Sequence, residues 1–493
     1  MGFFKKVASA PRTFANFLTR PNPNGEITKW QKFLLSFPSM PAILSNVLIH
    51  NAFIKFYTDI IGLDPKYVGI IYLIFGIWNA INDPAIGVLI DRFKFTEKRG
   101  KFVYLMKVTA PITVISAIGM VFAQPSWNQW IIFAFFLVLL FIYDTSYTTY
   151  NIAKISYVLV SAPSNKERVD VAAIDVYVGN IGGLLGTLIP TLLLVGKSNR
   201  PLTVILFAVV LVINSLLYFI ALKPLKDLKE MYAAENKEID ERKGIFGDLF
   251  DNGKAILKSK AFVSYILYQL ISRGPKFFYF TPFLYMMDYV LKLKGIEATV
   301  VDVIPGIILF IVVPFASKFI KKTGLKNATI LATIPGALGF LAIYFIGSFW
   351  QAVIAYVVMY IFTSIAAMTH TPILGAVIDD DEQRTGMRKA GLYNGMNALL
   401  TIPVSGIQAA IFTAILSGYQ FVSGSETQSL HAIQGIKVGA GLIPFIFTLV
   451  GVIPMLFFPI NKKKEQELSE FSVKQRHAVI NEDTEQTEGH EKL

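Results

Sequence analysis

Long apolar stretches alternate with short polar ones along almost the whole chain. Windows of about 20 apolar residues match the thickness of the hydrocarbon core of a bilayer. Several of them contain Gly or Pro, which membrane helices tolerate better than soluble helices do. The pattern predicts twelve membrane-spanning helices, with the limits 33–55, 66–90, 102–124, 129–152, 171–196, 202–222, 261–290, 297–319, 326–347, 350–378, 389–418 and 437–460.

The polar segments indicate how these spans are grouped. The longest internal one, residues 223–260, leaves six spans on either side, and residues 87–92 after span two have a weak counterpart in residues 316–324 after span eight. We therefore predict an all-α polytopic membrane protein of two pseudo-symmetric six-helix bundles. The expected parts are an N-terminal segment (1–32), a first bundle (33–222), a linker (223–260), a second bundle (261–460) and a disordered tail (461–493).

Composition and charge support a membrane protein and orient it. Charged residues make up 16% of the chain, against about 25% in soluble domains. Most of the 46 Lys and Arg residues lie at the two ends or in loops after even-numbered spans. The few on the other side are Lys66, Lys197, Arg200, Lys292, Lys294 and Lys437. By the positive-inside rule we expect a multi-pass protein of the cell membrane with both termini in the cytoplasm. Because topology explains the net charge of +12, we expect no nucleic-acid partner.

Several function classes lack a sequence signal. The chain has no cysteine, and it has no nucleophile elbow, phosphate-binding loop or paired-histidine metal motif. The acidic run at residues 379–382 lies beside Arg384 and Arg388, so local charge pairing explains it more simply than a metal site. We expect no enzyme activity, no catalytic residue, no metal and no cofactor. The expected partners are a small-molecule substrate and the lipid bilayer, and we expect a monomer.

Ionisable residues inside spans are functional candidates because burying them in lipid is costly. On span two, Asn79, Asn82 and Asp83 are spaced to share one helix face, and Pro84 frees backbone carbonyls one turn earlier. These oxygens suit a small cation such as Na⁺, or Asp83 can carry a proton. The simpler alternative is that Asp83 only forms a hydrogen bond to a neighbouring helix.

Polar residues on other spans predict a hydrated central cavity. The substrate-binding candidates are Asn46, His50, Asp144, Asn151, Asp175, Arg273, Lys276, His370 and Asn394. The cationic members favour a negatively charged substrate. The alternative is that they form salt bridges with Asp144 and Asp175. Lys55 is close enough to the end of span one to extend its ammonium group to the interface, so we assign it no role.

Two stretches resemble the glycoside-pentoside-hexuronide:cation symporter family (melibiose permease-like) of the major facilitator superfamily. The first comprises residues 55–63, 77–87, 91–92 and 99–102. The second is the loop from span ten to span eleven, with residues 378–388 and 391–392. By the resemblance, Asp91, Arg92, Arg99 and Arg388 are cytoplasmic gate and loop residues.

The resemblance implies two-domain alternating access, usually of a sugar with Na⁺, Li⁺ or a proton. In such symporters two aspartates on span two hold the cation. Asp83 matches the second, but Asn79 stands at the first, and Ile402 replaces the lysine that partners them. These departures favour proton coupling through Asp83, or no coupling. A sugar-binding aspartate of the family pattern falls at Asn151, and this departure argues against a simple galactoside as the ligand.

The sequence therefore predicts a secondary active transporter of a small polar solute, such as a glycoside, pentoside or hexuronide, in symport with H⁺ or Na⁺ through Asp83. Two alternatives stay open: transport of an amphiphilic, lysolipid-like substrate, and a non-transporting sensor on the same scaffold.

Overall fold

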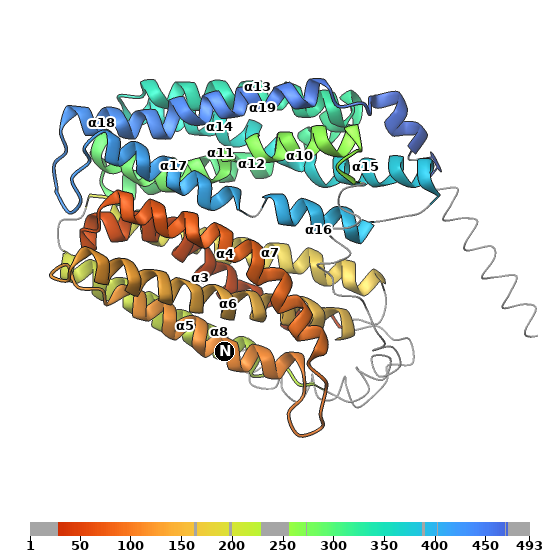
Figure 1. The fold of residues 1–493 in the computed structure, drawn as a ribbon, viewed down its shortest axis with the longest axis horizontal. Helices are drawn as coiled ribbons and strands as arrows, with labels where there is room; N and C mark the ends of the chain where they lie inside the picture. Colours follow the sequence, from red (N-terminus) through yellow and green to blue (C-terminus); the bar gives the residue numbers. More distant parts are fainter. Residues whose placement is uncertain are drawn as a thin grey trace, which may run out of the picture. The chain divides into compact units, whose positions relative to one another are not determined.

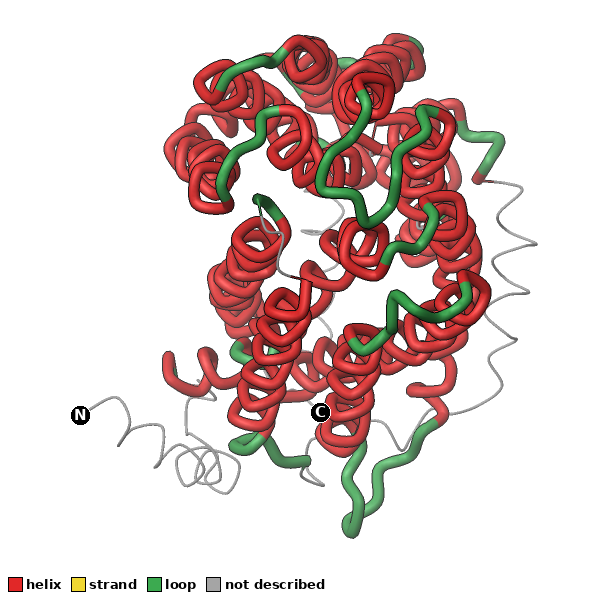
Figure 2. The backbone as a smooth tube through the Cα atoms, turned by 90° about the vertical axis from the view of Figure 1, so that its left-hand side faces the viewer, coloured by secondary structure: helices red, strands yellow, loops and turns green. Residues whose placement is uncertain are grey.

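The computed structural model consists of helices joined by short loops (Figure 2). The described residues are 28–161, 165–196, 200–227, 256–272, 274–386, 390–401, 403–468 and 470–471. Within these ranges there is no strand, only an isolated bridge between Thr96 and Gly100. Eleven described helices are long and apolar enough to cross a membrane. The predicted all-α polytopic architecture is confirmed.

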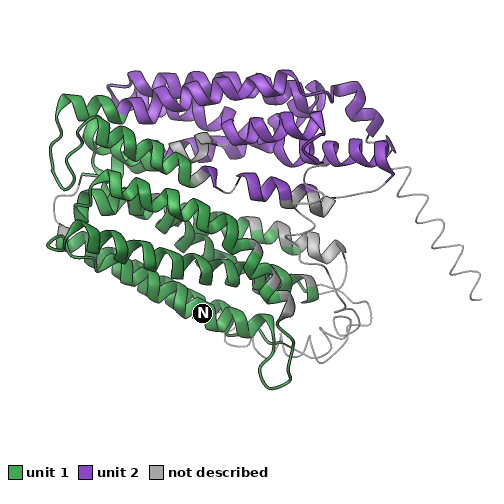
Figure 3. Cartoon of the chain, viewed as in Figure 1, with its two compact units in different colours: residues 1–242, 280–299, 406–436 green, residues 243–279, 300–405, 437–493 purple. Residues whose placement is uncertain are grey.

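The described helices form two compact units (Figure 3). One contains residues 1–242 together with residues 280–299 and 406–436, and the other contains residues 243–279, 300–405 and 437–493. Two segments from the second half of the sequence therefore pack with the first half. The division into bundles at the polar linker 223–260 remains a prediction, because residues 228–255 lie outside the described ranges.

The first unit contains the helices that carry most of the candidate residues, and Figure 1 shows α4, α5 and α6 as long ribbons lying side by side. Its elements are α2 (Lys29–Ser36), α3 (Ser39–Lys55), η1 (Phe56–Ile61), α4 (Pro65–Arg92), α5 (Phe102–Val121), α6 (Gln129–Ser161), α7 (Asn165–Leu194), α8 (Arg200–Leu222), η4 (Met286–Val290), most of α17 (Val404–Gly418) and most of α18 (Leu430–Lys437). Its core is rich in tyrosine, including Tyr150, Tyr157 and Tyr218.

The second unit is built mainly from residues after 255. Its elements are α10 (Lys260–Ser272), the first half of α11 (Gly274–Tyr285), most of α12 (Gly295–Thr323), α13 (Leu325–Phe345), α14 (Phe349–Met368), α15 (His370–Thr385), α16 (Ala390–Thr401), η5 (Val438–Leu442) and α19 (Ile443–Leu456). The predicted span 261–290 corresponds to α10, α11 and η4. Residue 273, between α10 and α11, lies outside the described ranges, so this predicted span is not among the eleven found in the described residues, and the other eleven predicted spans each correspond to one of them.

One helix ending occurs twice in the first unit. The helix α3 widens into the π-helical turn η1, and the Leu63 N–H then donates to the Tyr57 carbonyl at 2.8 Å. Likewise α11 widens into η4, and the Leu293 N–H donates to the Met287 carbonyl at 2.9 Å. Helices often end with a backbone hydrogen bond that spans one residue in the left-handed conformation. Here these residues are Gly62 and Lys292, whose φ angles are 82° and 51°. This repetition is what two related halves of a chain would produce.

Glycines allow helices to approach closely where lipid provides no hydrophobic drive for association. In the second unit, a Cβ atom at Gly339 on α13 would lie 2.6 Å from the backbone N and Cα of Met359 on α14. Because those atoms are backbone, no side-chain rotation can relieve the overlap. The contact between α13 and α14 therefore depends on glycine at this position.

We predict that Gly339→Leu lowers the thermal unfolding midpoint of the purified protein by several degrees, because overpacking of this kind costs about 1–3 kcal/mol or more. Gly306→Leu on α12 is the matched control, since a Cβ there would meet no atom within 4 Å. Equal midpoints for the two variants in a thermal-shift measurement would contradict this account of the packing.

Candidate functional site

The polar face predicted on span two lies against α6. Asp83 Oδ1 accepts a hydrogen bond from the Thr148 hydroxyl at 2.8 Å. Asn82 Nδ2 donates to Asp144 Oδ2 at 3.2 Å, and the Asn82 amide oxygen accepts from the Thr145 hydroxyl at 3.2 Å. Asp144, Thr145 and Thr148, at positions i, i+1 and i+4 of α6, thus meet the polar face of α4. We refer to Asn82, Asp83, Asp144, Thr145 and Thr148 as the carboxylate cluster.

Two acidic side chains share this cluster. Asp144 is 3% exposed and Asn82 is 7% exposed, while Asp83 is half-buried. Two ionised carboxylates on facing helices repel one another, and such repulsion is strong at low dielectric. Carboxylate, amide and hydroxyl oxygens are the ligands that hard cations prefer. The cluster therefore has the donors to take up a small cation or a proton. Asn79, one turn earlier on α4, is also half-buried.

His50 lies on α3 in an aromatic environment next to these helices. Its ring centroid is 5.3 Å from that of Phe75 on α4 and 6.3 Å from that of Tyr143 on α6. Nearby on α4, Trp78 stacks on Phe141 of α6 with centroids 4.5 Å apart. Flat aromatic faces of this kind suit the apolar faces of sugar rings as well as ordinary core packing. The other two candidates on these helices, Asn46 and Asn151, are half-buried.

Asp175 on α7 belongs to a charge pair that the sequence interpretation missed. The Lys154 ammonium is 3.4 Å from the Asp175 carboxylate and 2.5 Å from the Ser39 hydroxyl, which itself donates to Asp175. Lys154 was overlooked because span four was predicted to end at residue 152, whereas α6 continues to Ser161. The pairing proposed for Asp175 was with cations of other spans; within the described residues its cationic partner is Lys154.

The expectation that Lys55 reaches the membrane surface is wrong. Its side chain is 0% exposed, and its ammonium lies between two carboxylates. One is Asp59, a turn later, and the other is Asp288 from the second half of the sequence, at 2.7 Å. The rings of Tyr285 and Tyr289 flank the same ammonium, with centroids at 4.7 and 4.3 Å. We call these five residues the Lys55 cluster.

Further hydrogen bonds connect the Lys55 cluster to the surrounding loops. Tyr289 Oη donates to Asp59 at 2.8 Å, and the Gly196 N–H donates to Asp288 at 2.9 Å. The hydroxyls of Thr58 and Tyr285 are 2.6 Å apart. The cluster thus joins η1, η4 and the loop after α7 at one end of the first unit. The structural feature that points to it is the repeated helix ending, since the turn that carries Lys55 and Asp59 corresponds to the turn that carries Tyr285 and Tyr289.

Among the predicted gate residues, the structure describes the side chain of Arg99. It is exposed in the loop between α4 and α5, where its guanidinium lies 3.9 Å from the Phe93 ring centroid and donates to the Lys94 carbonyl at 3.1 Å. Six other candidates lie outside the described residues or side chains: Asp91, Arg92, Arg273, Lys276, Arg388 and Asn394. No group of three His, Asp or Glu side chains arranged to hold a metal occurs in the part of the chain that is described.

His370 belongs to the second unit. It begins α15, and its ring packs edge-on against Tyr268 of α10 with centroids 5.7 Å apart. In the same unit, Tyr279 of α11 donates to Asp302 of α12 at 2.5 Å. Each unit therefore has its own set of buried polar contacts, and the first unit holds both the carboxylate cluster and the Lys55 cluster.

Comparison with known proteins places these features in a family. Residues 34–462 match the model of the family described as MFS/sugar transport protein. An isoprimeverose transporter of Lactiplantibacillus pentosus is 22% identical over 463 residues, which cover 92% of each chain. The uncharacterized symporter YnaJ of Bacillus subtilis (strain 168) is 23% identical over 430 residues, covering 84% of this chain and 88% of the relative. The crystal structure of the nucleoside transporter NupG superposes with a TM-score of 0.62 at 14% identity over 87% of this chain and 98% of NupG. The chain therefore belongs to the MFS/sugar transport family and is a membrane transporter of the major facilitator type.

Proposed function

We propose that this protein carries a small polar solute of the glycoside, pentoside or hexuronide class across the cell membrane in symport with a proton or Na⁺. The observation that carries the proposal is the carboxylate cluster, in which the face of α4 that carries Asn82 and Asp83 meets Asp144, Thr145 and Thr148 of α6. Binding one cation or proton there relieves the repulsion between the two carboxylates. Solute and ion then move together by alternating access.

The carboxylate cluster also offers an explanation for Asn79, which replaces an aspartate of the family pattern. The family resemblance places two aspartates on span two, and the loss of one argues against Na⁺ coupling. The second carboxylate here comes from Asp144 on α6, which Asn82 joins to the Asp83 face. The negative charge of a two-carboxylate site is thus retained, although it comes from a different helix. Both H⁺ and Na⁺ remain candidates for the coupling ion.

The substrate class is supported by the relatives and by the aromatic side chains beside the cluster. The family is described as transporting sugars, and one relative is named for isoprimeverose. His50, Phe75 and Trp78 present aromatic faces next to the polar face of α4. A polar solute that also has apolar ring faces fits this combination.

The contacts of the Lys55 cluster can hold one end of the first unit closed. Removing one member of a buried ion pair costs about 3–5 kcal/mol because it leaves an uncompensated charge. When all members are present, the cluster ties η1 of the first half of the sequence to η4 of the second half. We propose that these contacts form in one state of the transport cycle and break in another.

We predict that Asp83→Asn abolishes accumulation of the solute against a gradient but retains exchange of labelled for unlabelled solute. Exchange requires only that the carrier alternates, whereas accumulation requires ion coupling. The measurement is uptake of radiolabelled pentosides, glycosides and a hexuronide into proteoliposomes, driven separately by a pH gradient and by a Na⁺ gradient. Whichever gradient drives uptake identifies the ion.

Asp64→Asn is the matched control for this measurement. Asp64 caps the start of the same helix by accepting from the Lys66 N–H at 2.8 Å, and asparagine caps equally well. It should transport like the wild type. If Asp83→Asn still accumulates solute, the assignment of the coupling site is wrong. If no sugar in the panel exchanges at all, the proposed substrate class is wrong.

We predict that Lys55→Met opens the end of the first unit that the Lys55 cluster closes, since Asp59 and Asp288 then repel each other without a cation between them. The natural absence of cysteine allows a single reporter thiol at Leu63, which is fully buried beside η1. Labelling of Leu63→Cys by a water-soluble maleimide should become at least about tenfold faster in the Lys55→Met background.

Two variants control this labelling experiment. Lys66→Met removes an exposed lysine at the same end and should leave the labelling rate unchanged. The triple variant Asp59→Asn, Lys55→Met, Asp288→Asn removes all three charges and should restore slow labelling. A rate that does not respond to Lys55→Met shows that the cluster does not hold this end closed.

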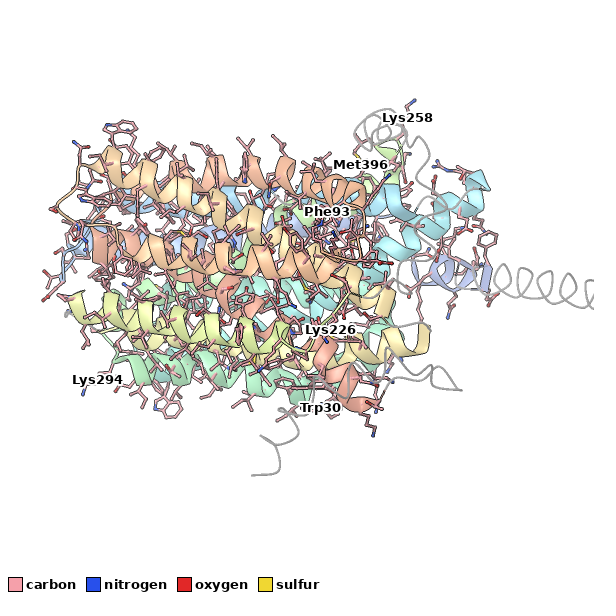
Figure 4. All side chains as sticks on the ribbon, turned by 90° about the horizontal axis from the view of Figure 1, so that it is seen from below. Trp30, Phe93, Lys226, Lys258, Lys294 and Met396 are labelled. Atoms are coloured by element: carbon pink, nitrogen blue, oxygen red, sulfur yellow. The ribbon has the colours of Figure 1, made fainter. Side chains whose placement is uncertain are left out.

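We predict that introduced cysteines report the orientation of the chain. Thr427 and Lys98 are both exposed. The loop with Thr427 lies at the start of α4, because Ser423 donates to the Leu63 carbonyl, whereas Lys98 follows the end of α4. Figure 4 likewise shows Lys294 at one end of the helices and Phe93 and Lys226 toward the other.

In intact cells an impermeant maleimide should label Thr427→Cys but not Lys98→Cys, while a permeant maleimide labels both. This result places the loop after α4 in the cytoplasm, as the positive-inside rule predicts. The reverse labelling pattern would refute the predicted orientation.

A further inference from the structure

A groove lies between α5 and α8 in the first unit, apart from the carboxylate cluster. Its volume is about 610 Å³. The residues that line it include Lys107, Ile115, Ile118, Tyr218, Phe219 and Lys223. None of them belongs to the carboxylate cluster or to the Lys55 cluster, so the transport proposal does not account for this groove.

The walls of the groove are apolar over a length that suits an acyl chain. Ile115 and Phe219 are 69% and 67% exposed in the structure, which is expected of side chains that face hydrocarbon. From Lys107 to Ile118, α5 rises by about 16 Å at 1.5 Å per residue. This is about half of the 30 Å hydrocarbon thickness. The groove is therefore long enough to extend through one leaflet of the bilayer.

The only charged residues that line the groove are two lysines, and the structure keeps them at the same end. Lys107 lies near the start of α5, and Lys223 directly follows the end of α8. Asp227 joins these two ends, because its carboxylate accepts from the backbone N–H groups of Lys101 and Val103 at 2.9 and 3.0 Å. That carboxylate is thereby engaged at the first turn of α5. The long lysine side chains can extend their ammonium groups to the level of the headgroups.

We propose that this groove binds one phospholipid of the bilayer through an anionic headgroup. The acyl chain lies along α5 and α8, and the ammonium groups of Lys107 and Lys223 contact the headgroup phosphate. Charge complementarity selects the occupant, since an apolar groove through one leaflet that ends in two cations matches a lipid with excess negative charge. The lipid is a resident ligand and is not the transported solute.

Such a lipid would contact the packed interior of the first unit. Tyr218 lines the groove, and its hydroxyl is 3.0 Å from the Ser45 hydroxyl on α3. The Tyr218 ring also packs edge-on against Tyr150 of α6, with centroids 5.1 Å apart. The lipid thus fills a gap beside residues that connect α8 to both α3 and α6.

Native mass spectrometry of the full-length protein tests the proposal. The purified protein is titrated with phosphatidylglycerol or phosphatidylcholine of identical acyl chains, and the affinity of the first bound lipid is measured. Phosphatidylglycerol should bind about tenfold or more tightly than phosphatidylcholine. The Lys107→Gln, Lys223→Gln double variant should lose that preference. Lys318→Gln, Lys321→Gln, which removes two exposed lysines from the end of α12, should keep it.

A second variant separates the groove from general attraction to basic loops. Ile115→Trp places a larger side chain in the acyl path and should weaken binding of both lipids while leaving the lysines unchanged. The proposal is overturned if the two glutamine double variants behave alike, or if Ile115→Trp binds both lipids as the wild type does. It is equally overturned if proteoliposomes transport a fluorescent lysophospholipid at a rate that depends on Lys107 and Lys223, because the occupant would then be a substrate.

Discussion

The absence of water from the hydrocarbon core is the constraint on which the rest of this structure depends. Each buried polar group must find its partner within the protein, so the chain is helical and its intramembrane charges occur in groups. Lys55 is held by Asp59 and Asp288, and Lys154 by Asp175. Asp83 accepts from the hydroxyl of Thr148, and Asp144 accepts from the amide of Asn82. These contacts place two acidic side chains in one polar cluster between α4 and α6.

The repeated helix ending explains why the Lys55 cluster forms where it does. Leu63 corresponds to Leu293, and Pro65, which begins α4, corresponds to Gly295, which begins α12. In this register Lys55 corresponds to Tyr285 and Asp59 to Tyr289. Each of these tyrosine rings flanks the ammonium of Lys55, and Tyr289 also donates to Asp59. Equivalent positions of the two halves therefore meet around a single buried charge, and the two halves have diverged to make that contact complementary.

The sequence was sufficient for the features that depend on local pattern. Hydrophobic windows located the spans to within a few residues in most cases, and helical spacing placed Asn82 and Asp83 on one face, which the structure sets against α6. Features that depend on long-range pairing were missed. Lys55 lies near the end of a span, and only its contact with Asp288, far away in the sequence, shows that it is buried. Lys154 was missed because apolar windows end where α6 becomes polar, although the helix continues with its charged residue buried against α7.

The position of Asp144 shows how a change in one helix can be compensated by another. The family that the sequence resembles has two aspartates at the cation site on span two. Asparagine at position 79 leaves only one of these two negative charges on that span. In the cation site that we propose, the neighbouring helix would provide that charge, because Asp144 of α6 is joined through Asn82 to the face that carries Asp83. The oxygens around Asp83 then come from two helices instead of one. A cation bound there would hold α4 and α6 together, whereas a proton on Asp83 would neutralise one carboxylate without bridging the helices. The identity of the coupling ion therefore also determines how firmly α4 and α6 are held together during transport.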